Sequence, residues 1–188
     1  MQITIDKKTG TLLGVVAALV LAIVFLLAGN SSTPMDHSSH GSTTSGDEEM
    51  FAQMMIPHHE QAVTMSELAL TNTTNPEVLA LATAIRDAQA PEIEQMKSWL
   101  DGKSEMDMHS HNMEMGGMLT EAELTELASL KDAAFDQMFL TAMIAHHEGA
   151  LDMLSMIKDS TKPEVKRLYE NILTSQSAEI EAMKALLK

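Results

Sequence analysis

One stretch of the chain occurs twice, and this duplication constrains the fold more than any other feature. The first copy, FAQMMIPHHEQAVTMSELAL, begins at Phe51, and the second, FLTAMIAHHEGALDMLSMIK, begins at Phe139. In both copies Phe, Met, His, Ala and Met follow one another at steps of three and four, which places them along one face of a helix. These stripes are Phe51, Met55, His58, Ala62, Met65 and Ala69, and Phe139, Met143, His146, Ala150, Met153 and Ile157. Each copy therefore predicts a helix whose buried face carries a histidine between two methionines.

The segment that follows each copy is duplicated as well. Residues 75–100 match residues 162–187 at an offset of 87 positions. The Asn-Pro-Glu that opens the first of these segments is typical of a helix start, with a capping Asn, Pro at the first position and an acidic first turn. A two-helix hairpin therefore occurs twice, at 47–100 and 120–188, and the two hairpins would bury their apolar faces against each other. We expect an all-α fold, a ferritin-like four-helix bundle over 47–188.

A long crossover, 101–119, joins the two hairpins. It lacks helical periodicity and contains two consecutive glycines, so we expect a loop of the kind that links the halves of ferritin-like bundles. Thr120 and Glu123 then form a predicted capping box that begins a short helix. Pro57 is expected to kink the first long helix, which we place at about 47–70. The crossover also holds seven candidate metal ligands, which are Met106, Met108, His109, His111, Met113, Met115 and Met118.

The N-terminal residues 1–29 predict a membrane segment. Lys7 and Lys8 precede the apolar run 12–28, which is just long enough to span a bilayer. We expect an uncleaved anchor with the bundle outside the cytoplasm; the alternative is a signal segment that is cleaved to give a secreted or periplasmic protein. The Ser/Thr/Gly-rich stretch 30–46 reads as a flexible linker. It carries three further candidate ligands, Met35, His37 and His40.

The composition excludes several classes of function. The formal net charge of −15 argues against nucleic acid or anionic lipid as a partner and favours cations. The chain has no Cys, which excludes a disulfide framework, a thiolate metal site and thiol catalysis. It has 17 Met in 188 residues, far above ordinary use. A protein that binds soft metals in an oxidising compartment can use thioethers, since a thioether forms no disulfide.

All eight histidines fall in four close pairs, and each pair has methionine nearby. Imidazole together with thioether suits Cu(I), and Ag(I) by the same softness, whereas Zn²⁺ prefers thiolates or further imidazole and carboxylate ligands. Mg²⁺ and Ca²⁺ prefer oxygen. We therefore expect copper, as Cu(I), to be the bound metal. The candidate ligands in the predicted bundle are Met55, His58, His59, Met65, Met96, Met143, His146, His147, Met153 and Met183.

Polar residues on the second helix of each hairpin face the same core. In an antiparallel hairpin, the stripe histidine lies level with a Gln and a Glu of the next helix. These are Gln89 and Glu92 beside His58, and Gln176 and Glu179 beside His146. Buried polar groups need partners, so we expect Glu92 either to orient His58 through a hydrogen bond or to bind the metal itself.

Structural interpretations of the same residues remain open. Met65 and Met153 could be core filler, since methionine at helical spacing usually is. The stripe histidines, bonded to glutamate, could be satisfied polar pairs. His59 lies off the stripe and is either a flanking ligand or a surface residue. Glu60 and Glu148 lie on the opposite side of their helices, and we expect both to be solvated.

The paired M-I-x-H-H-E motifs, with Phe135-Asp136 upstream of the second, resemble the bacterial family known as domain of unknown function 305. The resemblance covers about 47–187, and the M-I-P-H-H stretch is specific. It implies a ferritin-like bundle, an extracytoplasmic location and, for some members, copper handling. Glu48 stands where the first copy would have the counterpart of Asp136, so the halves are not expected to be identical. Residue by residue, the resemblance points to Met55, His58, His59 and Met65, and to Met143, His146, His147 and Met153.

The main hypothesis from the sequence is a non-enzymatic protein that captures Cu(I) outside the cytoplasm, for tolerance or for exchange with a copper-donor or copper-acceptor protein. We expect the tightest site in the bundle at His58 and His146, with weaker sites in the linker and the crossover. A module that binds another protein through a Met-rich surface is one alternative. The other is a ferritin-like dinuclear metal oxidase, although the paired Glu-x-x-His of such centres is absent. Its ligands would be His58, Glu92, His146 and Glu179.

Overall fold

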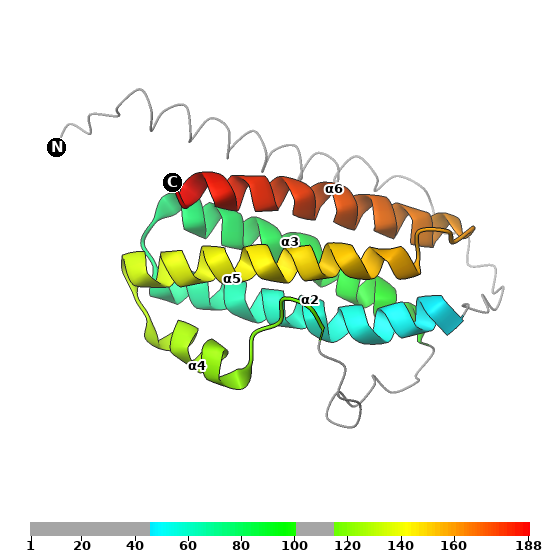
Figure 1. The fold of residues 1–188 in the computed structure, drawn as a ribbon, viewed down its shortest axis with the longest axis horizontal. Coiled ribbons are helices and arrows are strands. Elements are labelled where there is room, and N and C mark those ends of the chain that lie inside the picture. The colour runs from blue at the N-terminus through cyan, green and yellow to red at the C-terminus, as the bar shows by residue number, and fades with distance from the viewer. Residues whose placement is uncertain (1–45, 101–114) are drawn as a thin grey trace.

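The computed structural model describes residues 46–100 and 115–188, and the regular elements in these ranges are all helical (Figure 1). The all-α prediction is confirmed for this part of the chain. The predicted membrane segment, nearly all of the linker and most of the crossover lie outside the described residues. Among the helices that are described, none is both long and apolar enough to cross a bilayer. The elements are α2 (Gly46–Asn72), α3 (Pro76–Trp99), α4 (Glu121–Ser129), α5 (Asp132–Met153), the 3₁₀ turn η1 (Leu154–Met156) and α6 (Pro163–Leu186).

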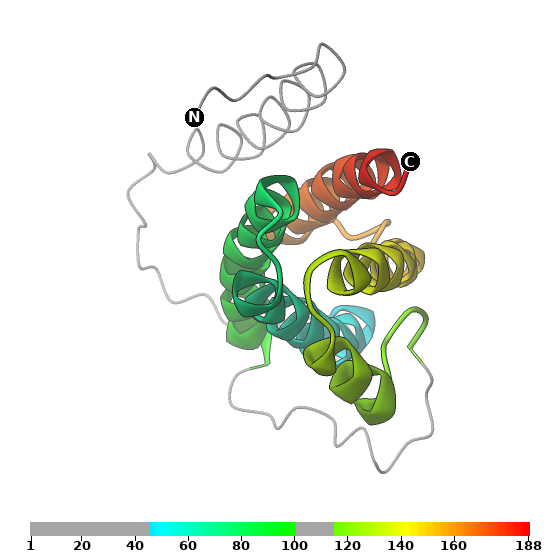
Figure 2. The same ribbon diagram turned by 90° about the vertical axis from the view of Figure 1, so that its left-hand side faces the viewer.

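The four long helices form a bundle of two antiparallel hairpins (Figures 1 and 2). α2 pairs with α3, and α5 pairs with α6. The two hairpins meet mainly where α2 packs against α5, and α3 also contacts α6. The short helix α4 lies at the outside of the bundle and packs against α5 and α2. Because α2 and α5 carry the duplicated His-His-Glu motifs, this packing brings the two motifs together in the core.

Capping side chains account for the starts of α3 and α4. The Asn75 side chain caps α3 by accepting a hydrogen bond from the backbone N–H of Glu77, at 3.1 Å. Thr120 and Glu123 form the predicted capping box at the start of α4. α2 runs without interruption through Pro57 and ends at Asn72, two residues beyond the predicted end.

The acidic residues near the starts of α2 and α5 tie the two hairpins together. Asp136 Oδ2 accepts a hydrogen bond from Asn75 Nδ2, the cap of α3, at 3.0 Å. In the other half, Glu48 accepts hydrogen bonds from Ser160 Oγ at 2.6 Å and from Lys162 Nζ at 2.8 Å, at the start of α6. Each acid therefore reaches the turn of the opposite hairpin. The first copy has Glu where the second has Asp, and the link between the hairpins is present in both. Glu48 accepts from Ser160 and Lys162, whereas Asp136 accepts from Asn75.

The core consists of two hydrophobic clusters separated by a polar layer. The first cluster includes Phe51, Met55, Ile93, Met96, Met115, Met153, Leu168 and Ile172. The second cluster includes Met65, Ile85, Phe135, Phe139, Met143, Ile180 and Met183. On every long helix, two buried polar side chains lie between the residues of the first cluster and those of the second. A four-helix bundle with a continuous apolar core needs no such layer. The buried polar side chains therefore need an explanation.

Candidate metal centre

The polar layer contains two side chains from each long helix of the bundle. Each of them is at most 7% exposed. The duplication gives the layer an approximate two-fold relation, because α2 and α5 supply the histidines whereas α3 and α6 supply the amides and carboxylates. Its members are His58, His59, Gln89, Glu92, His146, His147, Gln176 and Glu179.

His58 and His146 meet at the centre of this layer. Their ring centroids lie 3.8 Å apart, with the ring planes tilted by 37°. Burial lowers the pKa of His58 to about 3 and lowers the pKa of His146 well below 6.5. Both imidazoles are therefore neutral at pH 7. A neutral imidazole keeps one ring nitrogen with a free lone pair, which is the form that binds metals.

Many polar atoms of the layer have no hydrogen-bond partner in the described part of the chain. His58 donates from Nε2 to the carbonyl oxygen of Gly116 at 3.2 Å, but its Nδ1 is unpaired. Both ring nitrogens of His146 are unpaired, and so are both amide atoms of Gln89 and of Gln176. Buried polar groups are nearly always bonded, and each unpaired group costs about 1–3 kcal/mol. Neither His58 nor His146 is bonded to a glutamate, so the interpretation of both as histidine–glutamate pairs is wrong.

The expected bond between Glu92 and His58 is also wrong. Glu92 Oε2 accepts from His59 Nε2 at 3.0 Å, and Glu179 Oε2 accepts from His147 Nε2 at 2.7 Å. The reason is that α2 faces two neighbours, since its hairpin partner α3 packs on one side and α5 packs on another. His58 faces α5, whereas His59, one residue further around the helix, faces α3. His59 is fully buried, which excludes the alternative of a surface residue.

Glu60 and Glu148 lie on the solvated side, as predicted. Their side chains are 43% and 56% exposed. Glu60 forms an ion pair with Lys97 at 2.9 Å, and Glu148 forms one with Lys184 at 3.5 Å. The third residue of each His-His-Glu motif therefore lies outside the polar layer.

The buried methionines lie in the two clusters that flank the polar layer. Six of the predicted ligands in the bundle are at most 8% exposed and pack in these clusters. The first cluster also receives Met115, and Met118 packs against it although it was predicted as part of a loop site. The remaining ligands predicted in the crossover and the linker lie outside the described residues, namely Met106, Met108, His109, His111, Met113, Met35, His37 and His40. The six predicted ligands in the two clusters are Met55, Met65, Met96, Met143, Met153 and Met183.

Residues 115–119, which we call the strap, cover the polar layer. A β-carbon at Gly149 would lie 1.8 Å from the carbonyl oxygen of Gly116, so only glycine at this position of α5 lets the strap lie on the helix. Gly117 has φ +79° and lies against the backbone of α5. On α2, Gln61 exchanges two hydrogen bonds with the backbone of Leu119, at 2.8 and 2.7 Å.

The strap was not found by reasoning from the sequence. Gln61 and Gly149 occupy the same position of the repeat, directly after His-His-Glu. This difference between otherwise matching motifs was the available signal, together with Gly116-Gly117. Its meaning depends on which segment crosses the helix at that point, and periodicity does not report that.

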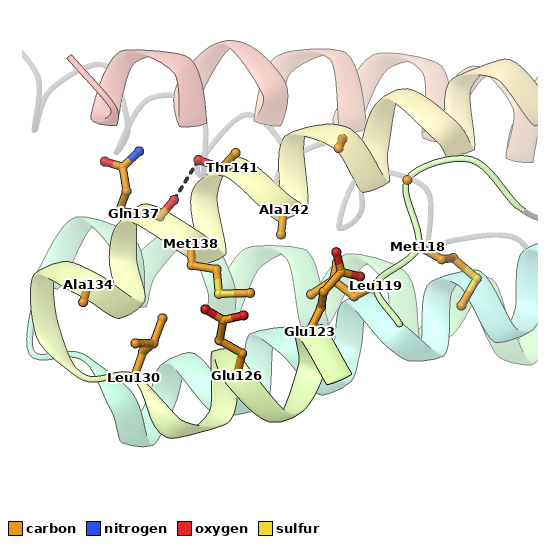
Figure 3. A pocket seen from close by; sticks show the side chains of 12 residues that line it. Met118, Leu119, Glu123, Glu126, Leu130, Ala134, Gln137, Met138, Thr141 and Ala142 are labelled. Carbon is orange, nitrogen blue, oxygen red and sulfur yellow. Dashed lines mark hydrogen bonds between the residues drawn. The ribbon is translucent and has the colours of Figure 1, made fainter. Parts of the chain in front are cut away.

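An open groove of about 720 Å³ lies beside the strap, between α4 and α5 (Figure 3). Its walls are mostly apolar, and in Figure 3 the Met138 side chain points toward Glu126. Gly117 lines the groove and separates it from the backbone of His146. The groove is therefore distinct from the polar layer.

All four residues named for a dinuclear oxidase lie in the polar layer. Glu92 and Glu179 are bonded to His59 and His147, the neighbours of the proposed histidine ligands. Across 46–100 and 115–188, no three His, Asp or Glu side chains are grouped to hold a metal ion. What the layer does present is a pair of neutral imidazoles between two clusters that contain thioethers.

The fold and the layer define a duplicated four-helix bundle with a buried histidine centre. The chain belongs to the family described as Domain of unknown function (DUF305), whose model matches residues 48–187. The resemblance of the His-His-Glu motifs to this family is confirmed.

Solved structures of the family share the fold. A DUF305 fragment from Deinococcus radiodurans is 32% identical, with a TM-score of 0.68 over 76% of this chain and 96% of that one. A DUF305 protein from Streptomyces coelicolor, described as secreted, is 34% identical, with a TM-score of 0.68 over 75% of this chain and 91% of that one. CopM in a Cu(II)-bound form is 34% identical, with a TM-score of 0.63 over 74% of this chain and 95% of that one.

CopM has also been solved in Cu(I)-bound and Ag-bound forms, both with TM-scores of 0.59 to this chain. A curated relative, the uncharacterized protein L153 of Acanthamoeba polyphaga mimivirus, is 42% identical over 55 residues. That match spans 29% of this chain and about a third of the viral protein, 36%.

Proposed function

We propose that this chain is a non-enzymatic protein that captures Cu(I), and Ag(I) by the same chemistry, in the polar layer of its bundle. The observation that carries the proposal is the pair His58 and His146. Their rings are neutral, almost fully buried and 3.8 Å apart, and three of their four ring nitrogens lack partners. Each buried polar atom without a partner costs free energy, so a site with three of them is favourable when a ligand pairs with them.

The chemistry of the layer favours a soft ion with a single charge. Two imidazoles satisfy the preference of Cu(I) for few, neutral ligands, and methionine sulfur in the adjoining clusters can complete the set. The carboxylates of Glu92 and Glu179 lie in the same layer and offset the charge of a buried cation. The net charge of −15 attracts cations to the molecule as a whole.

The relatives support a copper ion as the cargo. CopM, 34% identical to this chain, has been solved with Cu(I), Cu(II) and Ag. Cu(I) and Ag(I) are the forms that match the imidazole and thioether donors here.

We also propose that the bundle lies outside the cytoplasm, anchored through residues 12–28. The Lys pair before this apolar run favours that orientation, and the relative described as secreted supports an extracytoplasmic location. Membrane fractions tested by alkaline extraction distinguish the two forms. An anchored chain stays with the membrane, whereas a chain cleaved near residue 29 appears in the soluble extracytoplasmic fraction.

An anaerobic Cu(I) competition titration tests the proposed site. The full chain is compared with a double variant, His58→Leu with His146→Leu, because leucine fills the core and removes the unpaired nitrogens. We expect this variant to fold and to lose the tightest class of binding. The matched control is His37→Leu with His40→Leu, which should lower capacity but keep the tightest affinity. A core variant that titrates like the parent would refute the proposal.

A further inference from the structure

The strap contributes one polar atom to the layer, the carbonyl oxygen of Gly116. This oxygen accepts a hydrogen bond from His58 Nε2 at 3.2 Å. A carbonyl oxygen only accepts, so the ring proton must lie on Nε2. The other nitrogen, Nδ1, then carries the lone pair, and it is buried without a partner. The strap therefore selects one of the two tautomers of His58.

Two other histidines of the layer have the same pattern. His59 and His147 each donate from Nε2 to a buried carboxylate, at 3.0 and 2.7 Å, and each leaves Nδ1 without a partner. Three of the four imidazoles are thus held through Nε2, with Nδ1 directed away from the holding group. His146 is the exception, since neither of its nitrogens donates to a carboxylate or to the strap.

We propose that the Gly116 carbonyl is a positioning group that fixes His58 as the Nε2–H tautomer, so that a soft metal ion in the polar layer binds His58 through Nδ1. This inference rests on the proposed function. It adds that His58 binds the ion through Nδ1 and that the Gly116 carbonyl holds the ring. It also makes the halves of the duplication unequal. One half provides a ligand held by the strap, His58, and the other provides His146, which has no counterpart of this strap contact.

Two glycines and one glutamine of the sequence permit the contact between the strap and His58. Gly149 and Gly117 let the strap lie directly on α5, and a β-carbon at either position would come within 2.1 Å of a backbone oxygen. Gln61 holds the end of the strap through two hydrogen bonds to Leu119. Outer partners of metal-binding histidines typically contribute 10–100-fold to metal affinity.

Long-range ¹H–¹⁵N NMR of the histidine rings tests the assignment in the full chain labelled with ¹⁵N-histidine. In the metal-free protein we expect His58, His59 and His147 to be Nε2–H tautomers. Titration with Ag(I), which is diamagnetic and not reduced or oxidised during the experiment, should shift His58 Nδ1 and leave its Nε2 protonated. An Nδ1–H tautomer of His58, or an Ag(I) shift at its Nε2, overturns the inference.

A glycine variant separates the strap from the rest of the fold. Gly149→Ala should displace the Gly116 carbonyl, mix the tautomers of His58 and weaken Ag(I) binding 10–100-fold, while His59 and His147 keep their tautomers. The matched control is Gly46→Ala, because a β-carbon there meets nothing within 4 Å. If Gly149→Ala fails to fold, Gln61→Ala loosens the strap without a clash and should change His58 in the same direction.

The outcomes separate this inference from the proposed function. Ag(I) that shifts no histidine of the layer overturns both. Ag(I) that binds the layer with unchanged affinity in Gly149→Ala, although His58 has changed tautomer, overturns only the role of the strap. A tautomer change that appears together with weaker binding supports the inference, because a contact that served only to pack the loop would leave the affinity for Ag(I) unchanged.

Discussion

Adjacent residues of one helix have separate tasks in this protein. One residue of α-helix turns the side chain by about 100°, so His58 and His59 point at different neighbours. His58 meets His146 of the other hairpin, whereas His59 bonds to Glu92 of its own hairpin. The first contact leaves nitrogens open to a ligand, and the second fixes a ring within the core. The duplicated motif repeats this division at His147 and Glu179.

Removing one buried carboxylate should destabilise the fold. In Glu92→Leu the N–H of His59 is buried without an acceptor, which should cost about 1–3 kcal/mol in the free energy of unfolding. The matched control is Glu60→Leu, which removes an exposed ion pair with Lys97 and should cost less than about 1 kcal/mol. Urea denaturation followed by circular dichroism measures both. Equal losses in the two variants would mean that the His59–Glu92 bond contributes nothing beyond a surface pair.

The metal-free protein should lose stability in acid through His58 and His146. Burial lowers the pKa of both rings, so the folded state stays neutral while the unfolded chain takes up protons at a pKa near 6.5. Stability contributed by the neutral rings is therefore present above pH 6.5 and is lost as the pH falls toward 3. At pH 5 the loss is about 2 kcal/mol for His58, and His146 contributes a further loss in the same direction.

Urea unfolding between pH 7 and pH 5 checks the loss in acid. The variant His58→Leu with His146→Leu should show a much smaller dependence on pH, because leucine takes up no proton. If the parent and this variant lose stability equally, other groups cause the effect.

At the scale of the elements, the helices themselves could be predicted from the sequence. Steps of three and four placed α2 and α5, and Asn75 and Thr120 marked starts that the structure shows. The partner of His59 could not be predicted, because periodicity says which face is buried but not which neighbour covers each part of it. The strap could not be predicted either, since its contacts are made by backbone atoms of Gly116 and Gly149.

The cap of α3 also links two hairpins, and two variants separate these roles. Asn75→Ala removes the bond to the Glu77 N–H and the bond to Asp136, and should cost about 2 kcal/mol. Asn75→Ser keeps a capping oxygen and loses only the bond to Asp136, so it should cost about 1 kcal/mol. Thermal unfolding of the three proteins at one pH measures the difference. If Ser and Ala destabilise equally, the cap makes no separate contribution.

At the scale of the whole molecule, the polar layer interrupts what would otherwise be one hydrophobic core. The layer joins all four long helices, so an ion that binds there links both hairpins at once. Its members come from positions 58 to 179 and meet only in the folded chain. The candidate ligands of the crossover, in contrast, lie within a few residues of each other in the sequence.

This difference predicts where metal binding stabilises the fold. An ion that binds only the folded chain adds RT ln(1 + [L]/Kd), which is about 2.7 kcal/mol at a hundredfold excess over Kd. The crossover ligands can hold an ion in the unfolded chain as well, so binding there should add little. Ag(I) should therefore raise the thermal midpoint of the parent and of a variant that lacks residues 105–113, although the deletion binds fewer ions. It should not raise the midpoint of the variant His58→Leu with His146→Leu. The opposite result, with stabilisation lost on the deletion and kept in the core variant, would place the metal in the crossover and leave the bundle as its scaffold.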